Sequence, residues 1–190
     1  DTLEGRVLKN SELSSLVRCR LADVVSAPAE LDQLVERLLG EALAAPVVAH
    51  GEDVSKLMDS AASQRKASGS FTVLSLAERA RAHATGAGES LASRLRVAPE
   101  AEGLIDALLG DVRVVKDAAE AVRAHEAEPT LTYVAPGGVV AYPDGRTVAG
   151  TLAGAAAGTL ERRRRIADLE QSMPALEREV RAAQEGVVSA

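Results

Sequence analysis

Side chains that could act as nucleophiles, metal ligands or acid–base catalysts are scattered along the chain. The three histidines, His50, His83 and His125, are far apart, and none has a histidine or cysteine three or four residues away to share a metal ion. The single cysteine, Cys19, has no partner for a disulfide or a Cys-x-x-Cys zinc motif. No Gly-x-Ser-x-Gly turn is present, and no carboxylate pair stands out. We therefore predict no catalytic residue, no metal site and no enzymatic activity.

Four consecutive arginines, Arg162, Arg163, Arg164 and Arg165, are the strongest run of charge. Residues 141–165 carry five basic and two acidic side chains, a local charge of +3 that could meet DNA phosphates. The alternative is a solvated helix face, which is what charge runs usually are. The chain as a whole carries a net charge of −6 and only three aromatic residues, which disfavours binding by bulk attraction or base stacking.

Several glycines between Gly150 and Gly158 superficially suggest a phosphate-binding loop. No Gly-Lys-Ser/Thr follows them, so we predict no nucleotide site and no cofactor. Other glycines, notably Gly137 and Gly145, lie in Pro-Gly-Gly and Pro-Asp-Gly turn signals. These turns separate three expected strands, at 130–134, 139–142 and 147–149, and predict a compact β-region.

A repeated pattern precedes this region. An apolar helical spacing at 31–41 is followed by a β-type run at 46–49, and the same order recurs at 103–111 and 112–115. Each helix is expected to end at a glycine in the left-handed conformation, and each strand to lead into a further helix, at 53–62 and 117–127. Between the copies we expect a strand at 71–74 and a helix at 75–83. Helix, strand, helix thus occurs twice, which predicts two related α/β lobes.

The final segment has a different pattern. A helix is expected from Thr159, the residue that could cap it, and apolar residues then recur at alternating spacings of three and four: Ile166, Leu169, Met173, Leu176 and Val180. This is the seam of a coiled coil. Pro174 interrupts the pattern and predicts a kink or an early end, because proline lacks a backbone N–H.

The colinear order of these parts resembles the hinge domain of SMC (structural maintenance of chromosomes) proteins of the bacterial condensin type. LLGDVRVVKD at 108–117 resembles the family's second-lobe motif "LLG-D-V-x-V-V-x-D", and ERLLG at 36–40 resembles its first-lobe "E-x-x-LG". SGSFTVL at 68–74 is similar to the glycine and aromatic strand of the family. GTLERRRRI at 158–166 is similar to its exit into the returning coil.

The resemblance implies a mixed α/β (α+β) fold with a hinge at 1–158, divided into lobe I at about 1–84 and lobe II at about 89–158, and a coiled-coil arm at 159–190. It also implies homodimerisation that joins two arms and closes a ring, with ATPase heads elsewhere in the parent protein. The family places glycine pairs at its dimer contact. Here the matching interface positions are Gly137, Gly145, Arg146, Gly150 and Thr151, and one glycine of two pairs is replaced.

Compartment and partners follow from the same features. The lone thiol fits a reducing, cytoplasmic location, and neither a signal peptide nor a membrane span is apparent. The resemblance to SMC proteins further implies association with the nucleoid. The expected partner is a second copy of the chain. Weak DNA binding by the arginine run is the alternative function.

Overall fold

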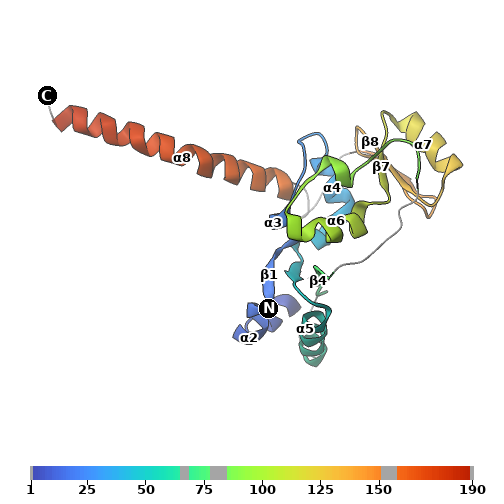
Figure 1. Cartoon of the computed structure of the whole chain (residues 1–190), viewed down its shortest axis with the longest axis horizontal. Helices are drawn as coiled ribbons and strands as arrows, with labels where there is room; N and C mark the ends of the chain where they lie inside the picture. Colours follow the sequence, from blue (N-terminus) through green and yellow to red (C-terminus); the bar gives the residue numbers. More distant parts are fainter. Residues whose placement is uncertain (1, 65–68, 78–84, 151–157, 189–190) are drawn as a thin grey trace.

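The chain folds into short helices and strands followed by one long helix (Figure 1), in a computed structural model that describes residues 2–64, 69–77, 85–150 and 158–188. Its α-helices are α1 (Leu3–Val7), α2 (Ser11–Ser15), α3 (Leu21–Val24), α4 (Asp32–Leu39), α5 (Gly51–Ser63), α6 (Glu102–Leu109), α7 (Ala118–Ala127) and α8 (Thr159–Val188). Its strands are β1 (Val17–Arg20), β2 (Val25–Ser26), β3 (Pro46–Val48), β4 (Leu74–Ser75), β5 (Glu89–Ser90), β6 (Arg96–Val97), β7 (Val112–Val114), β8 (Thr132–Ala135), β9 (Val139–Ala141) and β10 (Thr147–Val148). Three 3₁₀ turns are η1 (Gly40–Ala44), η2 (Ala92–Arg94) and η3 (Pro99–Ala101).

The strand pairing shows the repeat. In the first half β1 pairs antiparallel with β3, and β3 pairs parallel with β4. In the second half β5 pairs antiparallel with β7, and β7 pairs parallel with β8. Parallel neighbours require a crossover connection, which α5 and α7 supply. The predicted helix–strand–helix repeat is therefore confirmed as α4-β3-α5 and α6-β7-α7.

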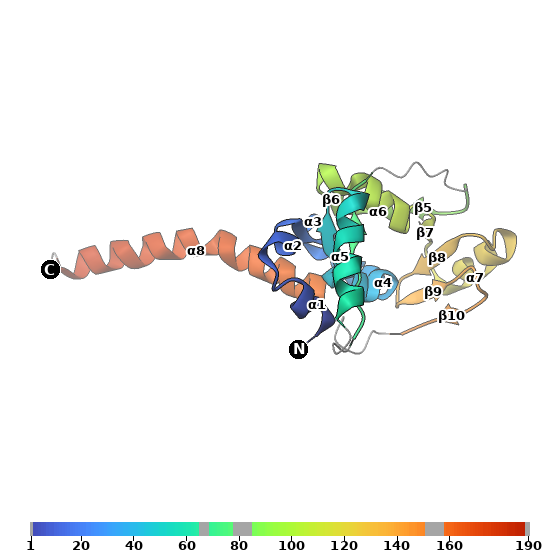
Figure 2. The ribbon, with the colours of Figure 1, turned by 90° about the horizontal axis from the view of Figure 1, so that it is seen from below.

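The second sheet continues into the predicted β-region. Its strand order is β10-β9-β8-β7-β5, and two antiparallel hairpins place β10 at one edge. The expected strands of this region are confirmed to within two residues at each end. Figure 2 shows α7 and β8 to β10 on the side of the molecule away from the free end of α8.

The two copies share a core. Leu34 and Val35 of α4 and Leu104 and Ile105 of α6 are buried in one apolar cluster, and β2 pairs with β6 across the two halves. Leu160, in the first turn of α8, is buried in the same cluster. The arm therefore begins inside the core of the folded domain. Because both lobes contribute side chains to this core, both stabilise the domain.

Some local expectations differ from the structure. Gly40 has a positive φ of 51°, but its ψ of −126° differs from that of the expected left-handed conformation. Gly110 is right-handed, so neither helix ends in that glycine conformation. Only Leu74 of the strand expected at 71–74 is in β4. Residues 75–77 are not helical, and residues 78–83 of that expected helix, His83 included, lie outside the described residues.

The early end expected as one outcome of Pro174 was wrong, because α8 continues through this residue. A proline removes one backbone donor, whereas the remaining hydrogen bonds of a 30-residue helix persist on both sides.

Candidate functional site

The predicted interface residues flank the edge strand β10. Gly137 lies in the turn between β8 and β9, Gly145 and Arg146 precede β10, and Gly150 follows it. All four are exposed. Thr151 lies outside the described residues. The structure thus groups four of the five predicted residues around one exposed strand edge.

At one end of β10 two turns pack backbone against backbone. The N–H of Gly150 donates to the carbonyl of Gly137 over 3.2 Å. A Cβ atom on Gly138 would lie 2.1 Å from the Gly150 carbonyl oxygen, and Gly138 has a φ of 72°. Gly138 is therefore the residue at which a side chain is excluded, whereas Gly137 and Gly150 face open space. The adjacent Gly-Gly pair was the sequence signal for it.

At the other end of β10 Arg146 organises the turn. Its backbone N–H donates to Asp144 Oδ1 over 3.0 Å, and its Nε donates to Asp144 Oδ2 over 2.7 Å. The guanidinium lies 4.7 Å from the centre of the Tyr142 ring. The hydrogen bond from the backbone N–H of Arg146 is the main reason that the pKa of Asp144 lies below its ordinary value, and the side-chain hydrogen bond from Arg146 adds to this effect. Arg146 thus replaces an expected glycine with contacts inside its own turn.

A contact across the molecule holds the end of β10. Arg37, on α4, donates from Nη2 to the Gly150 carbonyl oxygen over 2.7 Å. Arg37 is in the first half of the repeat and Gly150 is in the second, so this bond ties the β-region to the first copy.

The neighbouring residue on α4, Glu36, caps the arm. Glu36 is 1% exposed, and its carboxylate accepts hydrogen bonds from the N–H groups of Gly158 and Leu160, each over 2.7 Å. These N–H groups lie at the start of α8, where a helix has unpaired donors and a partial positive charge. The capping oxygen therefore comes from a distant helix, and Thr159, the predicted N-cap, is already the first residue of α8.

Two ion pairs attach the first turns of α8. Arg164 Nη1 lies 2.6 Å from Oδ2 of Asp32, a buried residue of α4. Burial raises the pKa of Asp32, and the Arg164 cation opposes that rise. Arg163 pairs with Asp23 of α3. Two of the four predicted DNA-binding arginines are therefore engaged with carboxylates of the folded domain. Arg162, Arg163 and Arg165 are exposed, and Arg164 is half-buried.

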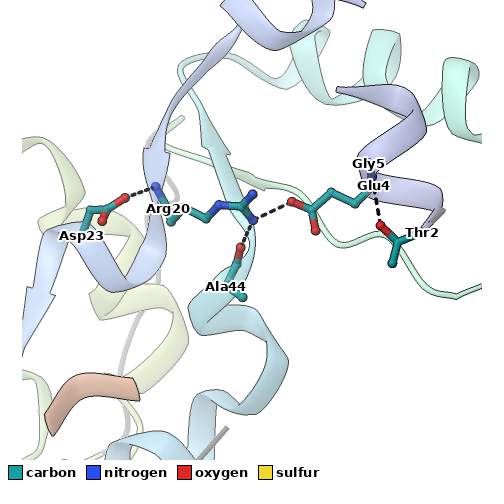
Figure 3. Close-up of polar contacts among 6 residues, drawn as sticks. All are labelled: Thr2, Glu4, Gly5, Arg20, Asp23 and Ala44. Carbon is teal, nitrogen blue, oxygen red and sulfur yellow. Dashed lines mark hydrogen bonds and ion pairs between the residues drawn. The ribbon is translucent and has the colours of Figure 1, made fainter. Parts of the chain in front are cut away.

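Helix α1, near the start of the chain, contacts the segment of β1 and α3 that also binds the arm (Figure 3). The Arg20 side chain lies between Glu4 of α1, 2.5 Å from its Oε1, and the carbonyl oxygen of Ala44. The Arg20 backbone N–H donates to Asp23 Oδ2 over 2.6 Å. Because Asp23 also pairs with Arg163, one short segment contacts both the N-terminal helix and the arm.

Beyond its first turns, which contact α3 and α4, α8 extends away from the domain (Figure 1). The predicted seam residues Ile166, Leu169, Met173 and Leu176 are each more than half exposed. The side chain of Val180 lies outside the described residues. The arm therefore presents an apolar stripe, and no other described helix of this chain covers it.

Sequence reasoning missed the contacts that Glu36, Arg37 and Asp32 make around β10 and the start of α8. A motif containing Glu36 and Arg37 was visible, but their contacts lie more than a hundred positions away and had no local signal. Among the described residues no group of three or more His, Cys, Asp or Glu could hold a metal ion. No helix in the described ranges combines the length and apolar character needed to cross a membrane.

Comparison with known proteins gives consistent matches. A family model described as "SMC proteins Flexible Hinge Domain" matches residues 15–125. Chromosome partition protein Smc of Myxococcus xanthus (strain DK1622) is 32% identical in an alignment over 164 residues that covers 83% of this chain and 14% of that protein. The chain thus spans a small part of the length of this relative.

Solved structures share the fold. An asymmetric dimer of the Geobacillus stearothermophilus SMC hinge domain matches with a TM-score of 0.65 at 21% identity, over 96% of this chain and 80% of that one. The Pyrococcus furiosus Smc hinge domain with an extended coiled coil matches with a TM-score of 0.62 at 18% identity, over 98% and 71%.

Gly138→Ala is expected to destabilise the domain by about 2–3 kcal/mol, because the new methyl group meets the Gly150 carbonyl at a positive φ. Urea unfolding followed by circular dichroism measures this loss. Gly103→Ala is the matched control, since Gly103 lies in α6 with open space around its Cβ position, and it should be neutral or slightly stabilising. Equal effects of the two substitutions would contradict the close approach.

Arg164→Gln is expected to destabilise the domain more near pH 7 than near pH 4. The pKa of Asp32 is higher in the folded state than its ordinary value of 3.8. Ionisation of Asp32 therefore lowers the free energy of unfolding as the pH rises from 3.8 through the pKa of the folded state. Removing the cation increases that cost, by about 1–3 kcal/mol near neutral pH, and protonation of Asp32 relieves it. Glu36 and Glu161 also raise this pKa and remain in the variant.

Urea unfolding at both pH values measures the difference. Arg165→Gln, one residue along the arm and exposed, is the control and should show no such dependence on pH. An equal loss at both pH values for Arg164→Gln would contradict the role given to the Asp32 pair.

Proposed function

The chain belongs to the SMC flexible hinge domain family, and from that premise we propose that it is a homodimerisation hinge which joins two coiled-coil arms in a chromosome-partitioning protein. Residues 1–158 form the hinge, with lobe I at about 1–84 and lobe II at about 89–158, and residues 159–190 begin the arm. The hinge itself carries no catalytic chemistry. The protein acts in the cytoplasm, at the nucleoid.

The observation that carries this proposal is the open edge of β10. Tyr142 donates its N–H to the Arg146 carbonyl, so Tyr142 and Arg146 form a hydrogen-bonded pair of the β9–β10 ladder. The next pair is Thr147 opposite Ala141, and hydrogen-bonded pairs alternate with pairs that are not hydrogen-bonded. In an antiparallel ladder this alternation turns the N–H and C=O of Thr147 away from β9, toward the outer edge. An outward pair of backbone groups on an exposed edge is a template for a strand from another chain.

The flanking residues suit such a strand addition. Gly145 and Gly150 have open space at their Cβ positions, so a second backbone can approach both ends of β10. Arg146 does not block the edge, because its side chain is held on Asp144 and Tyr142. A twofold-symmetric dimer would use the same surface on both copies and, if stable, bury on the order of 1,600 Å².

The arm supports the second part of the proposal. The apolar stripe on α8 has the spacing of a coiled-coil seam and is exposed in the isolated chain. In the full-length protein the helix that leads into the hinge would pair with α8, the returning helix, and cover this stripe. The N-terminal helix α1 and the arm are tied to one segment through Arg20 and Asp23, which supports two arms leaving from the same face and a ring closed by the hinge.

DNA binding by the arginine run is a second proposal, supported by the exposure of Arg162 and Arg165. The engagement of Arg163 and Arg164 with carboxylates reduces the free charge of the patch. Any such binding should therefore be weak and governed by phosphate contacts.

Thr147→Pro is expected to weaken the dimer at least about tenfold, because proline removes the outward donor without removing a bond to β9. Sedimentation equilibrium over a concentration series measures the dissociation constant. Thr147→Ala keeps the donor and is the matched control, which should dimerise like the unmodified chain. A monomer at tens of micromolar in the unmodified chain, or equal dimerisation by Thr147→Pro, would overturn the proposed edge.

The DNA proposal predicts a fluorescence anisotropy signal with short oligonucleotides that declines steeply as salt rises. The double variant Arg162→Gln with Arg165→Gln should abolish it, while Arg123→Gln on α7 should not. A signal that is absent at low salt, or one that survives the double substitution, would remove the patch as a DNA contact.

A further inference from the structure

Two adjacent side chains of α4 hold the two ends of the connection between β10 and the arm. Arg37 donates to the carbonyl of Gly150, the last described residue after β10. Glu36 accepts from the N–H groups of Gly158 and Leu160, where the arm begins. All three hydrogen bonds measure 2.7 Å. One turn of one helix thus contacts both the proposed dimer edge and the start of the arm.

The helix that carries these residues is fixed in the core. Leu34 and Val35, immediately before Glu36, are 2% and 0% exposed and pack in the cluster that joins the two copies of the repeat. Because core side chains are close-packed, α4 cannot shift without disturbing that cluster. The two anchor points therefore keep a constant separation and direction.

We propose that Glu36 and Arg37 are positioning residues that set the direction of arm α8 relative to the edge strand β10. This inference rests on the proposed function only in taking β10 as the dimer edge. In a symmetric dimer a fixed direction in each copy would set the angle between the two arms. Hydrogen bonds from one rigid element to both ends of a connection confine the geometry more than either bond alone.

The ion pairs of α8 give the alternative. Asp32 with Arg164 and Asp23 with Arg163 also attach the first turns of the arm to the domain. However, neither pair contacts Gly150 or β10. If these pairs alone held the arm, loss of the Arg37 contact would leave its direction unchanged, so Arg37 distinguishes the two accounts.

The test measures the direction of the arm within one protomer. Nitroxide labels at Glu126→Cys on α7 and Glu170→Cys on α8, both exposed positions, report their separation by double electron–electron resonance in a Cys19→Ser background. Dilution with unlabelled protein removes signals between protomers. We expect one narrow distance distribution, and Arg37→Ala or Glu36→Gln should roughly double its width while the melting temperature of the domain changes by only a few degrees.

Three further variants make the result specific. Arg37→Lys, which keeps a cationic donor, should restore most of the narrow distribution. Arg123→Ala on α7 and Glu41→Gln after α4, both exposed, should leave it unchanged. The double variant Glu36→Gln with Arg37→Ala should be little broader than the broader single variant, because the two residues act as a unit.

An unchanged distribution in Arg37→Ala would overturn the proposal, as would equal broadening by Arg123→Ala. The result is separable from dimerisation, which is measured by sedimentation on the same samples. A monomer whose distribution still broadens in Arg37→Ala would contradict the proposed dimer and leave the positioning role supported.

Discussion

The buried carboxylate of Glu36 is the contact on which the geometry of the arm depends. A helix begins with unpaired N–H groups and a partial positive charge, and Glu36 satisfies two of those groups from outside the helix. A buried carboxylate is costly unless it is fully hydrogen-bonded, so its position is narrowly defined. Because α4 packs in the core shared by both lobes, the start of the arm is defined by the fold and not by local sequence.

The sequence predicts those features of the fold that depend on short-range patterns. The spacing of Leu34, Leu38 and neighbouring apolar residues predicted α4, and the turn signals around Gly137 and Gly145 predicted the hairpins, because such patterns act over a few residues. The contacts of Glu36 and Arg37 join segments more than a hundred positions apart in sequence, which periodicity does not detect. The arginine run illustrates the difference: its charge was evident, but the carboxylates opposite Arg163 and Arg164 were not.

The side chain at one replaced glycine position, Arg146, is accommodated inside the protomer. Arg146 occupies a position where the family resemblance implies glycine, and its contacts with Asp144 and Tyr142 keep the side chain within its own turn. Gly138 allows the turn between β8 and β9 to pack against the Gly150 carbonyl, which follows β10. The edge of β10 thus remains available although the glycine pattern is incomplete, and Arg37 links that edge to the helix that caps the arm.

Hydrogen–deuterium exchange of the β10 amides, compared above and below the dimer dissociation constant, tests whether β10 is the edge through which two copies of the chain pair. The account predicts that the outward N–H of Thr147 exchanges rapidly in the dilute chain and becomes protected at high concentration, whereas amides of α5 exchange alike in both. If the chain dimerises and Thr147 exchanges at the same rapid rate at both concentrations, the dimer edge lies elsewhere and the account is contradicted.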